Sequence, residues 1–269
     1  MKAYQPRFSE EFLRAVVRTQ RWLAGNWYPC ARPLAGPAPL TAGRGLATAE
    51  TMVDDPGVST DRDLVASAAG LAWLVRYTDR LDRSDLAPHP LAASAGERYP
   101  VPHSPLFDFE RDTTGAAWID ELADVAVAAR AGDRWRRVIG HTDWSARNVR
   151  WDRRGVQAVF DLDSVAAVPD SFIAGQAAVT WATTMDVGEA PLPDPARIGE
   201  FLDVYHLIRE EPIKGPQIRA AWGSALWVLC YTARCEHAMD RSGAAVERLR
   251  RHGDELAQRA SDGGSAGSV

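Results

Sequence analysis

The sequence predicts an α+β protein in which a mostly helical second half contains one short β-hairpin. Apolar residues recur at helical spacing in several segments along the chain. Two β-prone runs, 149–151 and 156–160, are joined by residues 152–155, which end in a glycine and favour a hairpin. The segments after the hairpin again have helical patterns, so we expect helices to dominate the second half.

The first predicted element is a helix over residues 10–24. Ser9 precedes it as a cap, and the apolar residues that approximate one face are Phe12, Leu13, Val16, Val17 and Leu23. Residues 28–57 are rich in proline, glycine and alanine, so short β segments are the most that we expect there. Thr60 and Asp63 resemble a capping box, which predicts a long helix that continues to about Leu81.

The rest of the chain predicts further helices around the hairpin. Residues 88–105 contain repeated prolines and should be irregular, whereas residues 116–129 regain a helical pattern. Asp194 and Pro195 open a helix, and residues 216–238 and 244–260 form an apolar and a polar helix. The tail at 261–269 is expected to be disordered.

Composition limits the classes of function. The chain has 269 residues and a net charge of -5, which argues against a general nucleic-acid or anionic-membrane surface. The first residues do not read as a secretion signal, and the odd number of cysteines fits reduced thiols, so we expect a cytoplasmic protein. The nearly apolar run at 220–233 is too short to span a bilayer, so we expect a buried helix.

The residues that carry chemistry surround the hairpin. Asp143 and Asn148 precede its first strand, and Asp161 follows its second strand. Carboxylate and amide oxygens suit Mg²⁺, which completes its shell with water and phosphate oxygens. Phosphoryl transfer also needs a group that orients or deprotonates the acceptor hydroxyl, and Asp143 is the candidate for this base.

These residues also carry a family resemblance. His141, Asp143 and Asn148 resemble the His-x-Asp-x-x-x-x-Asn catalytic loop of kinases, and Asp161 follows Asn148 at the spacing of the metal-binding Asp. Because Asp-Leu-Asp-Ser stands where protein kinases have Asp-Phe-Gly, and the loop lacks their usual Lys, the chain looks more like the aminoglycoside phosphotransferase family of small-molecule kinases.

The resemblance implies a protein-kinase-like fold and a role for each matched residue. Asp143 would be the catalytic base, and Asn148 and Asp161 would bind Mg²⁺ that accompanies ATP or another nucleoside triphosphate. His141 would support the loop, and Asp163 would bind metal through water or bond to the loop backbone. The implied activity is transfer of the γ-phosphate to a hydroxyl of a small molecule, with a cationic, aminoglycoside-like acceptor as one candidate.

The sequence departs from the family before the catalytic loop. The family's phosphate-binding lysine lies in an N-terminal lobe, but the chain has only Lys2, which precedes every predicted strand, and Lys214, which follows the hairpin. Arg44, between Gly43 and Gly45, could replace a phosphate loop or mark a plain turn. We therefore predict a reduced N-terminal lobe and linker helix over 1–85 and a helical catalytic-type lobe over 86–260.

Two alternatives to phosphotransfer remain open at this point. The missing lysine favours a catalytically degenerate kinase fold that binds a ligand or partner, and the same pocket could serve acid or base chemistry without phosphate. Acidic side chains that could pair with a cationic acceptor are Asp186, Glu189, Glu200, Asp203 and Glu236. Tryptophans could line an apolar or sugar-stacking pocket, but core packing suits most of them; Trp144 is the exception, since it lies within the catalytic loop.

Overall fold

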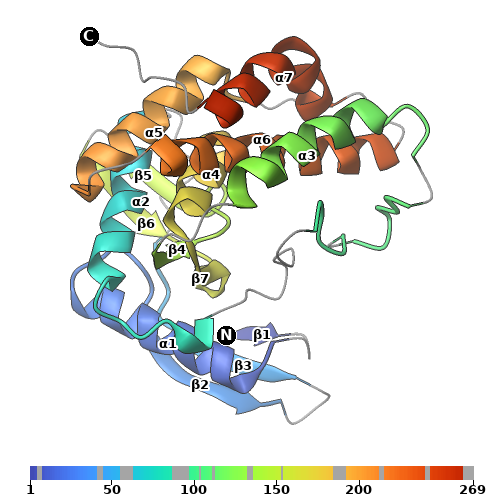
Figure 1. Cartoon of the computed structure of the whole chain (residues 1–269). Coiled ribbons are helices and arrows are strands. Elements are labelled where there is room, and N and C mark those ends of the chain that lie inside the picture. Colours follow the sequence, from blue (N-terminus) through green and yellow to red (C-terminus); the bar gives the residue numbers. More distant parts are fainter. Residues whose placement is uncertain are drawn as a thin grey trace.

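The computed structural model places the N-terminal sheet and first helix at one end of the molecule and the helical remainder at the other (Figure 1). It describes residues 1–4, 8–40, 45–54, 63–86, 97–102, 104–110, 113–131, 136–152, 154–183, 192–211, 215–239 and 243–262. Several predictions fall outside these ranges: the Thr60 cap, most of the irregular segment at 88–105, Gly43, Arg44, Asp186, Glu189, Lys214 and the tail from residue 263.

The N-terminal sheet is antiparallel and has the strand order β1-β3-β2. Its strands are β1 (Lys2–Tyr4), β2 (Pro33–Pro39) and β3 (Leu46–Glu50). The statement that Lys2 precedes every strand is therefore wrong, because Lys2 begins β1 and lies opposite Thr48 of β3. An isolated three-residue run carries too little periodicity to predict a strand, and its pairing partner lies far along the chain.

The first helix matches its prediction. Helix α1 spans Glu10–Gly25, and the Ser9 side chain accepts a hydrogen bond from the backbone N–H of Phe12. This cap satisfies one of the backbone donors that a helix start leaves unpaired. The predicted apolar face is buried, so α1 packs against the rest of the molecule through it.

The second helix begins later than predicted. Helix α2 spans Leu64–Thr78, and Asp63 caps it by accepting from the backbone N–H of Ala66. Asp63 was interpreted as the acidic partner in a capping box, but its own carboxylate performs the capping. The helix ends before Leu81 and packs against helix α5 (Pro195–Arg209) and strand β4 (Arg137–His141) of the second half. The boundary between 85 and 86 stays a prediction.

The predicted hairpin is confirmed. Strands β5 (Val149–Asp152) and β6 (Gly155–Val159) pair antiparallel, and Gly155 has a φ of 121° that favours glycine at this turn. A second antiparallel pair joins β4 (Arg137–His141) to β7 (Val165–Pro169). The short 3₁₀ helix η2 (Leu162–Ser164) connects β6 to β7, and a second one, η1 (Ser84–Leu86), follows α2.

The remaining helices form the second half of the molecule. They are α3 (Ala117–Ala131), α4 (Asp170–Thr180), α5 (Pro195–Arg209), α6 (Gly215–Ala238) and α7 (Ala244–Asp262). Helices α3, α5, α6 and α7 match predicted segments closely, whereas α4 was not predicted. The largely buried helix α6 packs against α3, α4 and α7. Ser261 and Asp262 belong to α7, so the predicted disorder from residue 261 is wrong for these two residues.

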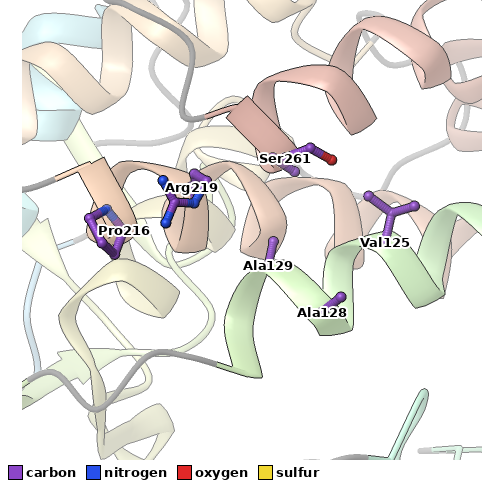
Figure 2. A pocket seen from close by; sticks show the side chains of 7 residues that line it. Val125, Ala128, Ala129, Pro216, Arg219 and Ser261 are labelled. Atoms are coloured by element: carbon purple, nitrogen blue, oxygen red, sulfur yellow. The ribbon is translucent and has the colours of Figure 1, made fainter.

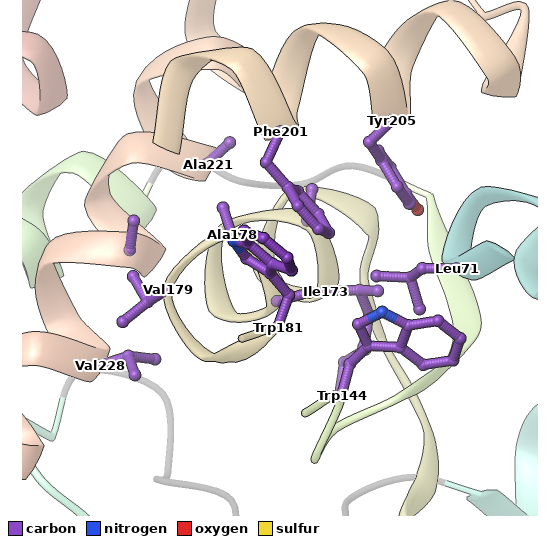
Figure 3. Close-up of a cluster of buried hydrophobic side chains, with 14 of the residues drawn as sticks. Leu71, Trp144, Ile173, Ala178, Val179, Trp181, Phe201, Tyr205, Ala221 and Val228 are labelled. Atoms are coloured by element: carbon purple, nitrogen blue, oxygen red, sulfur yellow. The ribbon is translucent and has the colours of Figure 1, made fainter. Parts of the chain in front are cut away.

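A continuous apolar core unites these elements, and Trp144 of the predicted catalytic loop lies within it (Figure 3). Trp144 is fully buried, and its indole Nε1–H donates to Ser67 Oγ of α2 at 3.0 Å. The exception made for Trp144 is therefore wrong: it anchors the loop instead of lining an open pocket. Trp181, Trp222 and Trp227 are also buried, as core packing predicts. Within the described ranges, no helix is long and apolar enough to cross a membrane.

Candidate functional site

The predicted catalytic loop connects β4 to β5, and His141 fixes its start. His141 is buried, and its Nδ1 accepts from the backbone N–H of Asp143 at 3.2 Å. Because Nδ1 accepts, the ring proton lies on Nε2, which donates to the Phe160 carbonyl at 3.0 Å. Burial lowers the pKa of His141. The Phe160 carbonyl and the neighbouring carboxylates act to raise it, but burial is the larger effect, so the ring stays neutral.

Asp143 and Asn148 are brought together within this loop. The Asn148 side-chain amide donates from Nδ2 to Asp143 Oδ2 at 2.8 Å and to the Asp143 carbonyl at 3.0 Å. Asn148 is buried, whereas Asp143 is exposed. The amide nitrogen is thus committed to Asp143, which leaves Asn148 Oδ1 as the atom suited to a cation. The Asp143 residue is exposed to solvent.

Asp161 lies directly after the hairpin in an αL conformation, with φ 55° and ψ 44°. Aspartate tolerates this region better than most residues because its short polar side chain can bond locally. The Asp161 Oδ2 atom accepts from Ser164 Oγ at 3.2 Å, which orients the carboxylate. This turn starts η2, the short helix that carries Asp163.

Backbone hydrogen bonds hold the catalytic loop beside the Asp161 turn. The Phe160 N–H donates to the Asn148 carbonyl at 2.7 Å. The backbone N–H and the hydroxyl of Thr142 both donate to the Ser164 carbonyl, at 2.9 and 2.7 Å. Contacts at both ends of the loop therefore tie it to residues that flank Asp161 and Asp163.

Lys2 is the site residue that the sequence interpretation missed. From β1, its ammonium Nζ donates to Asp161 Oδ1 at 3.0 Å and to Asp163 Oδ1 at 2.6 Å. Burial alone would lower the pKa of Lys2, but the carboxylates of Asp163 and Asp161 outweigh it and raise the pKa. Lys2 is therefore charged, and it connects the N-terminal sheet to the predicted metal-binding turn.

The donor chemistry fits a divalent cation. Asp161 and Asp163 already converge on one cation, the ammonium of Lys2, which shows that the turn concentrates negative charge. Carboxylate and amide oxygens are the hard ligands that Mg²⁺ and Ca²⁺ prefer. Among the described residues, no three His, Cys, Asp or Glu side chains group as a metal site, so a cation here would depend on Asn148 and on water or phosphate oxygens.

One cavity in the described part of the chain lies away from this constellation. A cavity of about 400 Å³ opens between α3, α6 and α7 (Figure 2). Its lining residues are Val125, Ala128, Ala129, Pro216, Arg219, Ala260 and Ser261. None of them belongs to the catalytic loop or to the Asp161 turn, so this cavity does not place a substrate beside Asp143.

Two of the acidic residues suggested for a cationic acceptor have partners within the chain. The Glu236 carboxylate accepts from the backbone N–H groups of Ala245 and Val246 at 3.1 and 2.9 Å, so it caps α7. Glu200 pairs with Arg197 at 2.6 Å on the exposed face of α5. Asp203 is exposed. The role suggested for Glu236 is therefore replaced by a structural one.

Comparison with known proteins identifies the family of this fold. The model of the phosphotransferase enzyme family (APH) matches residues 2–167, more than half of the 269-residue chain. The chain belongs to this family. The predicted resemblance and the kinase-like α+β fold are thereby confirmed.

Solved structures show the same fold at low sequence identity. The chain is similar to the amicoumacin kinase hAmiN in complex with AMP-PNP, Ca²⁺ and Ami, with 14% identity and a TM-score of 0.59; the match covers 94% of this chain and 79% of that chain. It is also similar to a choline kinase from Cryptosporidium parvum Iowa II, with 12% identity and a TM-score of 0.50, covering 96% and 80% of the two chains. No curated protein matches the chain.

Proposed function

We propose that this protein transfers the γ-phosphate of ATP or another nucleoside triphosphate to a hydroxyl of a small molecule. The observation that carries the proposal is the assembly of Asp143, Asn148 and the Asp161 turn, with Lys2 reaching the turn from the N-terminal sheet. Family membership supports phosphotransfer as the class of reaction. The relative described with AMP-PNP and Ca²⁺ supports a nucleotide and a divalent cation as its companions.

In this proposal Asp143 handles the proton of the acceptor hydroxyl. The acceptor oxygen forms a bond to the γ-phosphorus while the bond from that phosphorus to the bridging oxygen breaks, which releases the nucleoside diphosphate. The proton of the acceptor passes to the exposed carboxylate of Asp143. Asn148 holds that carboxylate by its 2.8 Å hydrogen bond, and His141 holds the Asp143 backbone.

Asn148 and Asp161 are the residues proposed to hold the divalent cation, which supplies charge neutralisation to the phosphate oxygens when bound. Lys2 is proposed to bind the phosphates. It would then serve as the phosphate-binding lysine of the N-terminal lobe, for which the sequence offered no candidate. Kinases hold that lysine with a helical Glu. Here Asp163, at 2.6 Å from the ammonium, is the residue proposed to anchor Lys2.

Product analysis by mass tests the proposed reaction. Purified protein with Mg²⁺, ATP and a panel of small hydroxylated molecules should yield a product heavier by one phosphoryl group. Asp143→Asn should lower kcat by about 10²-fold to 10⁴-fold, the usual effect of losing a general base, while nucleotide binding by calorimetry stays intact. Absence of Mg²⁺-dependent nucleotide binding in the wild type would refute the proposal.

The contacts of Lys2 also favour a second candidate function. Since its ammonium lies against both carboxylates, the lysine could neutralise the turn without a metal in a protein that binds a ligand or partner and catalyses nothing. Mg²⁺-dependent nucleotide turnover that disappears in Asp161→Asn would eliminate this candidate. Nucleotide binding that is indifferent to Mg²⁺, without turnover, would favour it.

A further inference from the structure

Helix α4 contacts the catalytic loop through two polar side chains. Gln176 and Thr180 lie four residues apart and therefore share one face of the helix. The Gln176 side-chain amide donates to the Thr142 carbonyl. The Thr180 hydroxyl lies 2.9 Å from the Trp144 carbonyl and 3.1 Å from the Gln176 carbonyl of its own helix, and the shorter contact is the one to the loop. The two loop carbonyls belong to the residues immediately before and after Asp143, so α4 holds the main chain on both sides of the proposed base.

The position of α4 is fixed on its other faces. A Cβ on Gly175 would lie 2.1 Å from the Ala221 carbonyl of α6, which shows how closely the two helices pack. Ile173 packs onto Gly140 of β4, where a Cβ would lie 2.5 Å from its side chain. At the start of the helix, Asp170 accepts from Tyr205 at 2.5 Å and from Arg209 Nη2 at 3.0 Å.

The direction of the Asp143 side chain depends on its backbone as well as on the hydrogen bond from Asn148. It is exposed, whereas its neighbour Trp144 is fully buried, so packing fixes the residue after the base but not the base itself. A general base must lie within hydrogen-bond reach of the proton it removes, and a misplacement of about 1 Å can cost about 10²-fold in rate. Contacts that fix the flanking peptides therefore have a direct effect on the reaction.

We infer that Gln176 and Thr180 are positioning residues that set the direction of Asp143. The inference rests on the proposed function, because it assigns them to the step in which Asp143 takes the acceptor proton. Neither side chain needs to touch the substrate. Their effect should therefore appear in the chemical step and not in nucleotide affinity.

The experiment compares Thr180→Val and Gln176→Met with a matched control in the purified full chain. Thr183→Val is the control, because Thr183 is buried and its hydroxyl donates only within the same helix end, to the Thr180 carbonyl at 3.1 Å. We expect kcat to fall by about 10-fold to 100-fold in Thr180→Val and Gln176→Met, with unchanged affinity for AMP-PNP and Mg²⁺ by calorimetry. Thr180→Ser, which keeps the hydroxyl, should restore kcat.

A double variant separates positioning from general destabilisation. Adding Thr180→Val to Asp143→Asn should lower kcat little further, because there is no base left to direct. Equal losses in Thr180→Val and Thr183→Val, or a full further loss in the Asp143→Asn background, would overturn the inference while leaving phosphotransfer by Asp143 intact. A wild type without phosphotransfer would overturn both.

Discussion

Lys2 is the single side chain on which the proposed phosphate site depends most. Its ammonium is partly buried between two carboxylates, and burial also favours strong interaction with a phosphate that replaces one of them. Arginine would keep the charge but bring a planar fork of different reach. The residue therefore combines charge with a compact shape that fits between Asp161 and Asp163.

Lys2→Met should weaken nucleotide binding by about 10-fold to 100-fold, the loss expected when a hydrogen bond to a charged group worth about 1.5–3 kcal/mol is removed. Calorimetric titration with AMP-PNP and Mg²⁺ measures the change. Lys2→Arg should recover only part of the affinity. Unchanged affinity in Lys2→Met would show that the lysine does not bind phosphate.

His206 predicts a dependence of stability on pH. Burial lowers the pKa of His206 to about 4. The nearby Asp170 carboxylate raises this pKa, and the Arg209 guanidinium lowers it. The unfolded chain should have the ordinary pKa of about 6.5, so neutral His206 stabilises the fold fully above that pH. The stability is lost as pH falls toward about 4, by less than about 1.4 kcal/mol per pH unit because the ring is partly exposed.

Urea unfolding of the wild type and His206→Gln between pH 7.5 and 4.5 measures this contribution. The free energy of unfolding should decline less steeply in the variant, because it no longer takes up a proton at this position on unfolding. Parallel declines would show that His206 is not the responsible group. His141, which is also held neutral by burial, stays in both proteins and does not affect the comparison.

At the level of single residues, the sequence predicted which site residues lie close together when they are also close along the chain. His141, Asp143 and Asn148 lie in one loop, and the hairpin brings Asp161 beside them, so their proximity follows from nearby residues. Lys2 could not be found in this way, because it reaches Asp161 from a strand that lies 159 residues earlier in the chain. The roles of these residues stay predictions until they are tested.

At the level of elements, close packing between α4 and α6 is a sensitive point. Gly175→Ala would place a Cβ 2.1 Å from the Ala221 carbonyl, so one helix must move. We expect a loss of about 1–3 kcal/mol in the free energy of unfolding, the usual cost of overpacking, and a lower kcat because α4 holds the loop. Gly25→Ala, at the end of α1, meets no atom within 4 Å and should be neutral or slightly stabilising.

The capping contact of Glu236 gives a second prediction for the helices. Glu236→Ala removes the carboxylate that accepts from two N–H groups of the first turn of α7, so stability should fall by about 1–2 kcal/mol. Thermal and urea unfolding measure this loss. The KM for any acceptor should stay unchanged. A large rise in KM with unchanged stability would show that Glu236 contributes to acceptor binding.

The predicted elements differ in how much local signal they carry. Helix α1 has a cap and one apolar face, and α5 has an Asp194 cap that accepts from the Arg197 N–H at 2.9 Å, so both were found. The segment that contains β7 and α4 is apolar on nearly every side, because it is surrounded by β4, α5 and α6. Amphipathic periodicity disappears in such a setting, which explains why α4 was missed.

At the scale of the whole molecule, ligand binding should stabilise the fold by mass action. At about 100 times its Kd, AMP-PNP with Mg²⁺ should raise the free energy of unfolding by about 2.7 kcal/mol. Differential scanning calorimetry with and without the nucleotide measures the corresponding shift in Tm. Asp161→Asn should lose most of the shift if Asp161 holds the cation. An equal shift in both proteins would place the nucleotide away from this turn.

Polar contacts of the N-terminal segment connect it to the hairpin and to the turn that follows it. The Val159 N–H of the hairpin donates to the Pro29 carbonyl at 2.7 Å, and Lys2 bridges to Asp161 and Asp163. The overall class, helices around a hairpin, was predictable from patterns along the chain. The arrangement of the sheet against the hairpin was not, because it depends on pairings between distant segments.

The pairing of β1 with β3 therefore decides more than the edge of a sheet. Lys2 lies opposite Thr48, and neighbouring side chains of a strand project from opposite faces. A slip by one residue would turn the ammonium away from the Asp161 turn and present Ala3 in its place. The alignment of a three-residue strand thus controls whether a positive charge reaches the proposed cation site at all.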